Sequence, residues 1–302
     1  MRNLQILPRL SDSMSFLYLE KTVIHRNQNT IEAVDQEGRI PIPVSALSVL
    51  ALGPGTSISH SAMNILAKNG CMVAWVGEEM TRFYAHGMGE TYKAYKVVRQ
   101  AELVSDPEKR KRVVIAMYQK RFEQVLDANL TLPQIRGHEG VRMREAYAEW
   151  SKKTGVAWDG RRYNFQSWGG NAINRALSSA NAILNAICNT VIVCAGYSPA
   201  LGFIHQGRQL SFVYDVADLY KTEITIPAAF SVVGAGEKDV EKRVRVEMRE
   251  RMHASKLISR ILPDIENLLD IDGEDDQAEE HIDPEQTHPI PLWEALFSEG
   301  EV

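Results

Sequence analysis

The spacing of apolar residues changes once along the chain, near residues 87–94, and this change constrains the fold more than any other feature. Before it, short β-branched and aromatic runs end at Asn, Asp or Gly, as strands do. Beyond it, apolar residues recur at the spacing of long helices. We therefore predict an α+β fold, with a small β-sandwich-like domain at residues 1–88, a linker at 89–94 and an all-helical domain at 95–270.

The first domain is predicted to consist of short strands and one helix. Glu37 and Gly38 separate two strand patterns by the two residues of a tight hairpin turn. The segment 58–68 fits a short helix that ends at Gly70. The strands are expected at 15–19, 22–25, 30–34, 39–44, 73–76 and 82–85.

Capping residues mark the helices of the second domain. Pro107 opens one helix, and Thr131 with Gln134 forms a capping box at the start of the next. Asn171 caps a long third helix. The most apolar stretch, 180–196, is interrupted by three Asn residues and is short for a membrane span, so we predict a buried helix and no membrane contact. Helices are expected at 107–127, 132–150, 172–195 and 209–220, with another within 237–269.

Charge is distributed unevenly along the chain. Fourteen Asp and Glu and no Lys or Arg lie between Asp264 and Val302, so we predict a flexible, acidic, Pro-containing tail at 271–302. The remaining 263 residues carry 34 Lys and Arg against 25 Asp and Glu. Such a basic body is compatible with phosphate binding, although a solvated basic surface explains it equally well. No secretory leader is predicted, and three cysteines without a Cys-x-x-Cys pair favour a reduced, intracellular protein.

The segment 202–221 carries the strongest chemical signal. His205, Asp215 and Asp218 are three potential metal ligands, and Lys221 adds a cation. At helical spacing the two Asp residues and the Lys fall on one side, where they could address a common ligand. Each residue alone has an ordinary explanation, such as a structural histidine, a helix cap or a salt bridge.

Glu139 is the candidate that would complete a metal site. It belongs to a series of residues spaced by four, with Ile135, Met143 and Tyr147, which places it on an apolar helix face. It is therefore predicted to face the domain interior. A buried carboxylate needs a cation or a hydrogen-bond donor, and either a metal or an arginine would satisfy it. The neighbouring His138 points about 100° away on the same helix and is predicted to be a bystander.

Carboxylate oxygens combined with one imidazole suit Mg²⁺ or Mn²⁺. Such an ion polarises a phosphodiester and activates an attacking hydroxyl or water. Lys221 could then hold a phosphate. Lys242, Arg245 and Arg249 recur at i, i+3 and i+7, where they could line a DNA backbone, although a solvated helix surface explains this stripe as well.

Several segments together resemble one known family. The chain is similar to the CRISPR-associated integrase of spacer acquisition, the first of the two universal adaptation proteins, and most of all to its subtype I-E branch. The resemblance extends over essentially the whole chain. It is carried by 136–140, Asn174, 196–205 and 211–219, with support from 52–56, 75–77 and 160–163.

This resemblance implies a metal-dependent DNA integrase and endonuclease of antiviral defence. Glu139, His205 and Asp218 would bind Mg²⁺ or Mn²⁺, with Asp215 as an auxiliary acidic residue of the catalytic set. The implied reaction joins the 3′-hydroxyl ends of a short DNA duplex, whose ends are splayed, to CRISPR repeat DNA by transesterification. The implied assembly contains two homodimers of this chain and a dimer of the small ferredoxin-like second adaptation protein, in the prokaryotic cytoplasm.

The resemblance also implies contacts with DNA. The motif next to the captured DNA would be read by residues of the helical domain and of the tail, at Tyr163, Arg208, Tyr214, Gln286 and Ile290. Further DNA contacts are expected at Lys221, Lys242, Arg245 and, in the β domain, Arg82.

Two other functions remain open. A nuclease acting on branched DNA would use the same metal site with water as the nucleophile, and a non-catalytic DNA-binding scaffold would only pair its acidic residues with arginines. Asn185 stands where this family branch can carry a tyrosine, which argues against a tyrosine nucleophile in either enzyme.

Overall fold

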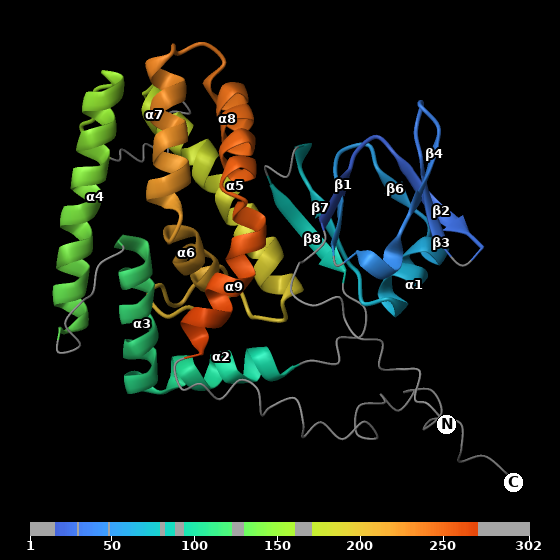
Figure 1. Cartoon of the computed structure of the whole chain (residues 1–302), viewed down its shortest axis with the longest axis horizontal. Helices are drawn as coiled ribbons and strands as arrows, with labels where there is room; N and C mark the ends of the chain where they lie inside the picture. Colours follow the sequence, from blue (N-terminus) through green and yellow to red (C-terminus); the bar gives the residue numbers. More distant parts are fainter. Residues whose placement is uncertain are drawn as a thin grey trace, which may run out of the picture.

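The computed structural model describes residues 16–28, 30–47, 49–78, 82–87, 94–122, 130–160 and 171–270. Its architecture confirms the predicted α+β class, because the strands lie together on one side of the molecule and the long helices on the other (Figure 1). Of the predicted linker only Ala94 is described, and the predicted tail at 271–302 lies outside the described residues.

The strands form two four-stranded sheets. The order in the first sheet is β1 (Phe16–Leu19), β5 (Val49–Leu52), β7 (Met72–Val76) and β8 (Phe83–Gly87). The order in the second sheet is β4 (Arg39–Ile42), β3 (Thr30–Val34), β2 (Val23–Asn27) and β6 (Ser57–Ile58). The predicted hairpin joins β3 to β4, and the Asp35 carboxylate accepts hydrogen bonds from the backbone N–H groups of Glu37 and Gly38.

A common core binds the two sheets and α1 (His60–Lys68) together. Ile24 and Ile31 of one sheet, Leu50 of the other and Leu66 of α1 are all fully buried in it. Strand β5 lies at the centre, with all four residues buried. Our sequence reading missed β5 because a strand that is buried on both faces has no alternation of polar and apolar residues.

The helical domain begins with α2 (Tyr95–Ser105), which the sequence reading also missed. It continues through α3 (Pro107–Phe122), α4 (Leu132–Thr154), α5 (Ala172–Cys194), α6 (Ser211–Asp218), the π-helical segment η3 (Lys221–Thr225), α7 (Ile226–Gly234), α8 (Val240–Ala254) and α9 (Leu257–Leu269). The predicted caps are present, since Thr131 and Gln134 form a capping box and Asn171 accepts a hydrogen bond from the N–H of Asn174. Lys256, with φ of 51°, separates α8 from α9.

Helix α5 is the core of this domain. It packs against α6, α7, α8 and α9 (Figure 1). Val193, in its last turn, belongs to the same apolar cluster as Val49 and Met72 of the first sheet. Among the described residues it is the one helix with the length and composition of a membrane span, and 61% of its apolar window is buried inside the protein. The Asn-containing apolar stretch is therefore a packed core helix in this structure.

The loop between α5 and α6 turns tightly around Gly202. A side chain at this position would overlap the carbonyl oxygen of His205 and would come within 2.7 Å of the Ser211 Cβ. Glycine is required here because backbone and side-chain atoms occupy the space of a Cβ, which brings His205 close to the start of α6.

Replacing Gly202 by Ala is expected to lower the free energy of unfolding by about 3 kcal/mol, because overpacking against backbone atoms cannot be relieved by a rotamer change. Urea denaturation measures this cost. The matched control is Gly207→Ala in the same loop, where a Cβ meets nothing within 4 Å and only the φ of 76° is unfavourable. The control should lose about 1 kcal/mol. Equal costs for the two variants would contradict the steric argument.

Candidate functional site

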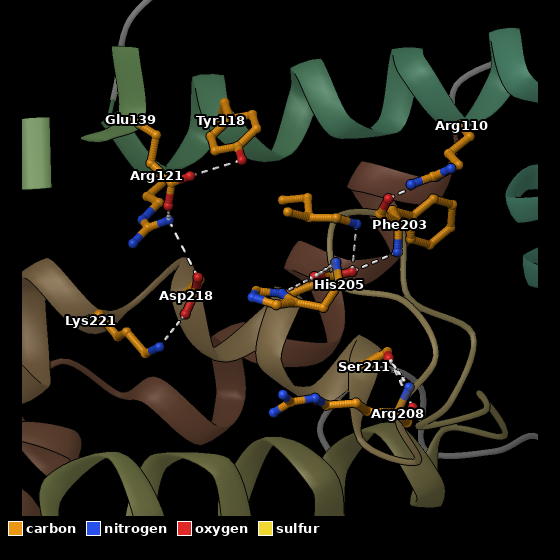
Figure 2. A network of polar contacts seen from close by, with 12 residues as sticks. Arg110, Tyr118, Arg121, Glu139, Phe203, His205, Arg208, Ser211, Asp218 and Lys221 are labelled. Atoms are coloured by element: carbon orange, nitrogen blue, oxygen red, sulfur yellow. Dashed lines mark hydrogen bonds and ion pairs between the residues drawn. The ribbon is translucent and has the colours of Figure 1, made fainter. Parts of the chain in front are cut away.

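Three segments far apart in sequence meet at Arg121, near the end of α3. Its Nη1 forms an ion pair with Glu139 of α4 and lies 3.5 Å from Asp218 Oδ2, at the end of α6. Figure 2 shows the guanidinium between these two carboxylates. The Tyr118 hydroxyl, one helical turn before Arg121, donates a 2.9 Å hydrogen bond to Glu139 Oε2. The predicted acidic residues from α4 and α6 are thus brought together, with a cation between them.

The environment of Arg121 is unusual for an arginine. Only 4% of its side chain is exposed, so the guanidinium is removed from bulk water. Its Nη2 faces the thioether of Met143 at 3.1 Å, and its Nε has no hydrogen-bond partner among the described atoms. Thioether sulfur is a weak acceptor. The two carboxylates are therefore what holds this buried charge in place.

His205 is oriented by Asp215. The Nδ1–H of His205 donates to Asp215 Oδ1 at 2.7 Å, and Asp215 also accepts the backbone N–H groups of Phe203, Ile204 and His205 at 2.6, 3.0 and 2.9 Å. The Asp215 side chain is fully buried, and these donors replace its lost hydration. Because Nδ1 is engaged, Nε2 is the nitrogen that can act as a metal ligand.

The pKa of His205 is raised above its ordinary value. The hydrogen bond to Asp215 is the main cause, and the charges of Asp215 and Asp218 add to it. Burial and the charge of Lys221 act in the opposite direction. The influence of Asp218 and Lys221 shows that the imidazole lies in the electrostatic field of the same acidic centre.

Asp215 and Asp218 were predicted to address a common ligand from one side of a helix, and the structure gives them different partners. Asp215 points into the loop that carries His205, whereas Asp218 forms ion pairs with Arg121 and Lys221. Lys221, predicted to contact DNA, is half-buried and directed at Asp218 (Figure 2). Asp215 is therefore a positioning residue, and its four hydrogen bonds leave it unsuited to binding a metal directly.

The buried Gln100 and the half-buried Arg110 fix the loop that precedes α6. The Gln100 amide donates to the carbonyl oxygens of Ser198 and Leu201 and accepts the N–H of Ser198. Arg110 Nε donates a 2.8 Å hydrogen bond to the carbonyl oxygen of Phe203. Helices α2 and α3 thereby hold the backbone on either side of Gly202, and His205 is placed by a rigid loop.

No group of three His, Cys, Asp or Glu side chains within the described ranges is preassembled at metal-binding distances. The residue types nevertheless suit a hard divalent ion, because two carboxylates share one buried cation and the charge of one of them, Asp218, also acts on an oriented imidazole. Asp218 Oδ1 is also buried and accepts no hydrogen bond from any described group, although Lys221 lies next to it. Arg121 thus joins Glu139 and Asp218, two of the three ligands predicted from sequence, and the charge of Asp218 contributes to the raised pKa of His205, the third.

The residues predicted to contact DNA are spread over several surfaces. Arg208 is exposed on the loop before α6, and the Tyr214 ring packs edge-on against His205 with centroids 5.8 Å apart. On α8, Lys242 and Arg249 are exposed and Arg245 is half-buried. Arg82 is exposed next to β8. The predictions for Tyr163, Gln286 and Ile290 lie outside the described residues.

The sequence reading missed Arg121 and Tyr118. It recognised that an arginine could satisfy Glu139 but named none, because α3 carries six Lys and Arg residues and nothing distinguished one of them. The exposed position of His138 agrees with its predicted role as a bystander.

The chain as a whole is similar to proteins of one known family. The model of the family described as CRISPR associated protein Cas1 matches residues 16–127 and 114–256. A relative from Thermus thermophilus, named CRISPR-associated endonuclease Cas1 2, is 48% identical over all of this chain and 92% of its own length. A relative from Clostridium sp., named CRISPR-associated endonuclease Cas1, is 40% identical over 95% of this chain and 94% of its own length.

A solved structure shows the same fold. The crystal structure of a TtCas1-DNA complex has a TM-score of 0.80 and 48% identity, and the match covers 87% of this chain and 99% of that one. A match of this extent includes parts of both the two-sheet domain and the helical domain.

The Asp215→Asn variant is expected to lower the pKa of His205 toward its ordinary value, because the amide removes the negative charge and presents an N–H₂ group to backbone donors. Loss of these hydrogen bonds should also cost about 2 kcal/mol or more of unfolding free energy. Titration of isotopically labelled His by NMR and urea denaturation measure both effects.

The pH dependence of stability follows from the raised pKa of folded His205. Its contribution is fully present below the unfolded pKa of about 6.5 and is lost as the pH rises through the higher folded pKa. This contribution of His205 to the pH dependence of the unfolding free energy should disappear in Asp215→Asn. Asp264→Asn, which removes a carboxylate bound to Tyr220 and Lys120, is the control and should leave the His205 titration unchanged. An unaltered His205 pKa in Asp215→Asn would show that Asp215 is not the cause.

Proposed function

The chain belongs to the CRISPR-associated protein Cas1 family, and on this basis we propose that it is a metal-dependent DNA integrase and endonuclease. It captures DNA and joins its 3′-hydroxyl ends to CRISPR repeat DNA by transesterification. The observation that carries the proposal is that Arg121 joins Glu139 to Asp218, while Asp215 orients His205 on the loop before the helix that carries Asp218. The endonuclease names of the relatives and the DNA-bound TtCas1 structure support it.

Glu139, Asp218 and Nε2 of His205 would hold the Mg²⁺ or Mn²⁺ ion. When bound, the ion supplies Lewis-acid activation of a phosphodiester and of the attacking hydroxyl. The protein's own part is to fix these three donors. Asp215 holds the imidazole in the tautomer whose Nε2 is free, and Tyr118 orients one oxygen of Glu139. The ligand set is thus supported by hydrogen bonds that set its geometry before DNA arrives.

DNA binding is assigned to the basic residues around this centre. Arg208 and Tyr214 adjoin His205, and Lys242, Arg245 and Arg249 form a stripe on α8. Lys221 is the cation nearest the acidic residues and would turn to a phosphate once Asp218 binds the metal. Arg82 would contact DNA from the β domain, and the proposed reading of the adjacent motif involves Tyr163, Gln286 and Ile290.

The finer assignments belong to the same proposal. We place the chain in the subtype I-E branch on the motifs that surround Glu139 and His205. It would act as two homodimers together with the small ferredoxin-like second adaptation protein, on duplex DNA with splayed 3′ ends, in the prokaryotic cytoplasm. The nuclease alternative predicts cleavage of branched DNA without joining, and the scaffold alternative predicts DNA binding without either reaction.

The Glu139→Gln variant should reduce the rate of strand joining about a hundredfold or more, because removal of a ligand charge forfeits several kcal/mol of transition-state stabilisation. The assay follows joining of a 3′-hydroxyl duplex to a repeat-bearing plasmid with Mg²⁺ or Mn²⁺ and the small partner. Glu145→Gln, an exposed carboxylate of the same helix, should retain activity. Full activity of Glu139→Gln would refute the site, and cleavage without joining in the wild type would favour the nuclease.

The α8 stripe is tested by salt dependence. The logarithm of the DNA association constant should fall linearly with the logarithm of salt concentration, because Lys and Arg release counterions from phosphates. Each of Lys242→Ala and Arg249→Ala should weaken binding regardless of DNA sequence and lower the slope by about 1. Fluorescence anisotropy at several salt concentrations measures both quantities. Lys68→Ala, at an exposed lysine of α1 in the two-sheet domain, is a charge-matched control, and equal effects there would remove the assignment of DNA binding to α8.

A further inference from the structure

We propose that Arg121 is a resident cation of the acidic centre, which stabilises the metal-free protein and which a divalent ion must displace on binding. The inference rests on the proposed metal-dependent function. It assigns a role to a residue of α3 that is not one of the proposed ligands: Arg121 sets how tightly the centre binds metal and how stable the centre is without it.

Position is the first line of support. The Arg121 guanidinium lies between Glu139 and Asp218, the two carboxylates proposed to hold the metal, and a single nitrogen, Nη1, contacts both (Figure 2). An ion that took oxygen ligands from the same two carboxylates would need the space and the lone pairs that this nitrogen uses. The guanidinium and a metal ion would therefore compete for the carboxylate oxygens of Glu139 and Asp218.

Charge balance is the second line of support. Glu139 and Asp218 carry two negative charges, and Arg121 and Lys221, which pair with them, carry two positive charges. The centre is therefore neutral as it stands. Adding a divalent ion while both cations remained would leave two uncompensated charges at a largely buried site, which is strongly unfavourable. Departure of Arg121 relieves the larger part of this conflict, because it is the more deeply buried of the two cations.

Incomplete hydrogen bonding is the third line of support. Of the donors of Arg121, Nε is buried without a partner in the described part of the chain, and Nη2 faces a thioether. A guanidinium with a permanent structural role is normally satisfied by oxygen acceptors, because an unsatisfied buried donor is costly. The guanidinium also lies 5.2 Å from the centroid of the Phe122 ring, but its oxygen acceptors are the two carboxylates. A cation with a higher charge can therefore replace it.

The competition has a quantitative consequence. If the metal binds only when the guanidinium is out of the centre, the apparent dissociation constant is the intrinsic one divided by the fraction of molecules in that state. Removing the guanidinium then tightens metal binding and destabilises the metal-free protein. An arginine that organised the carboxylates for the metal would have the opposite effect on affinity.

The test compares wild type with Arg121→Met, which keeps the length of the side chain and removes its charge. Titration calorimetry with Mn²⁺ alone should give a dissociation constant about tenfold lower for Arg121→Met, as expected if about one molecule in ten is competent in the wild type. Thermal unfolding in EDTA should show a melting temperature lower by roughly 5 °C, with a larger rise on adding Mn²⁺. Neither readout depends on catalytic activity.

Arg121→Lys and Arg251→Met complete the set. Lysine retains the charge but lacks the planar guanidinium whose Nη1 contacts both carboxylates, so its Mn²⁺ affinity should fall between those of wild type and Arg121→Met. This variant keeps the test valid if the Met variant unfolds in EDTA. Arg251 pairs with Glu247 on α8, away from the centre, and Arg251→Met should bind Mn²⁺ as wild type does.

Two results would overturn the inference and leave the metal site intact. They are equal Mn²⁺ affinity in wild type and the Arg121 variants, and weaker binding in Arg121→Met. A different result would overturn the proposed function as well. In that case the wild type would bind no Mn²⁺, or would bind Mn²⁺ equally well after Glu139→Gln. The failure of the inference and the failure of the metal site are thus separate observations.

Discussion

The hydrogen bonds accepted by Asp215 are the interaction on which the rest of the site depends. This carboxylate is fully buried in the middle of the short helix α6 and receives three consecutive backbone N–H groups and the imidazole of His205. Burying a carboxylate is unfavourable unless hydrogen-bond donors replace its water. The loop before α6 must therefore keep the conformation in which its N–H groups point at Asp215. Because Asp218 belongs to the same helix, the loop, His205 and Asp218 are fixed to one another by a single buried charge.

The two halves of the site differ in how their charge is satisfied. Asp215 is saturated by donors of the backbone, which cannot leave without unfolding the loop. Glu139 and Asp218 are instead satisfied mainly by side-chain cations, Arg121 and Lys221, which can rotate away. The fixed half can orient an imidazole, while the exchangeable half can accept a new cation or release one toward a phosphate. This division explains how one small region can be both rigid and able to bind.

Sequence patterns predicted the α+β class and most of the elements, because edge strands, hairpin turns and capped helices carry local signals. Strand β5 was missed because all four of its residues are buried and show no alternation. The inward face of Glu139 could be predicted from its four-residue spacing with apolar neighbours, but its partner could not. The choice of Arg121 among the basic residues of α3 depends on how α3 and α4 pack against α6, and that packing leaves no trace in the spacing of either helix.

Helix α5 strengthens the interactions between the charged residues of α6 and η3. Helix α5 packs against α6 and η3. Burial raises the pKa of its Cys188 thiol, and the charges of Lys221 and Asp218 also affect this pKa, in opposite directions. An apolar helix in direct contact with the charged residues keeps water away from one side of them. Charges next to such a surface interact more strongly than they would in bulk water. The same helix that builds the hydrophobic core therefore also strengthens the ion pairs that Asp218 forms with Arg121 and Lys221.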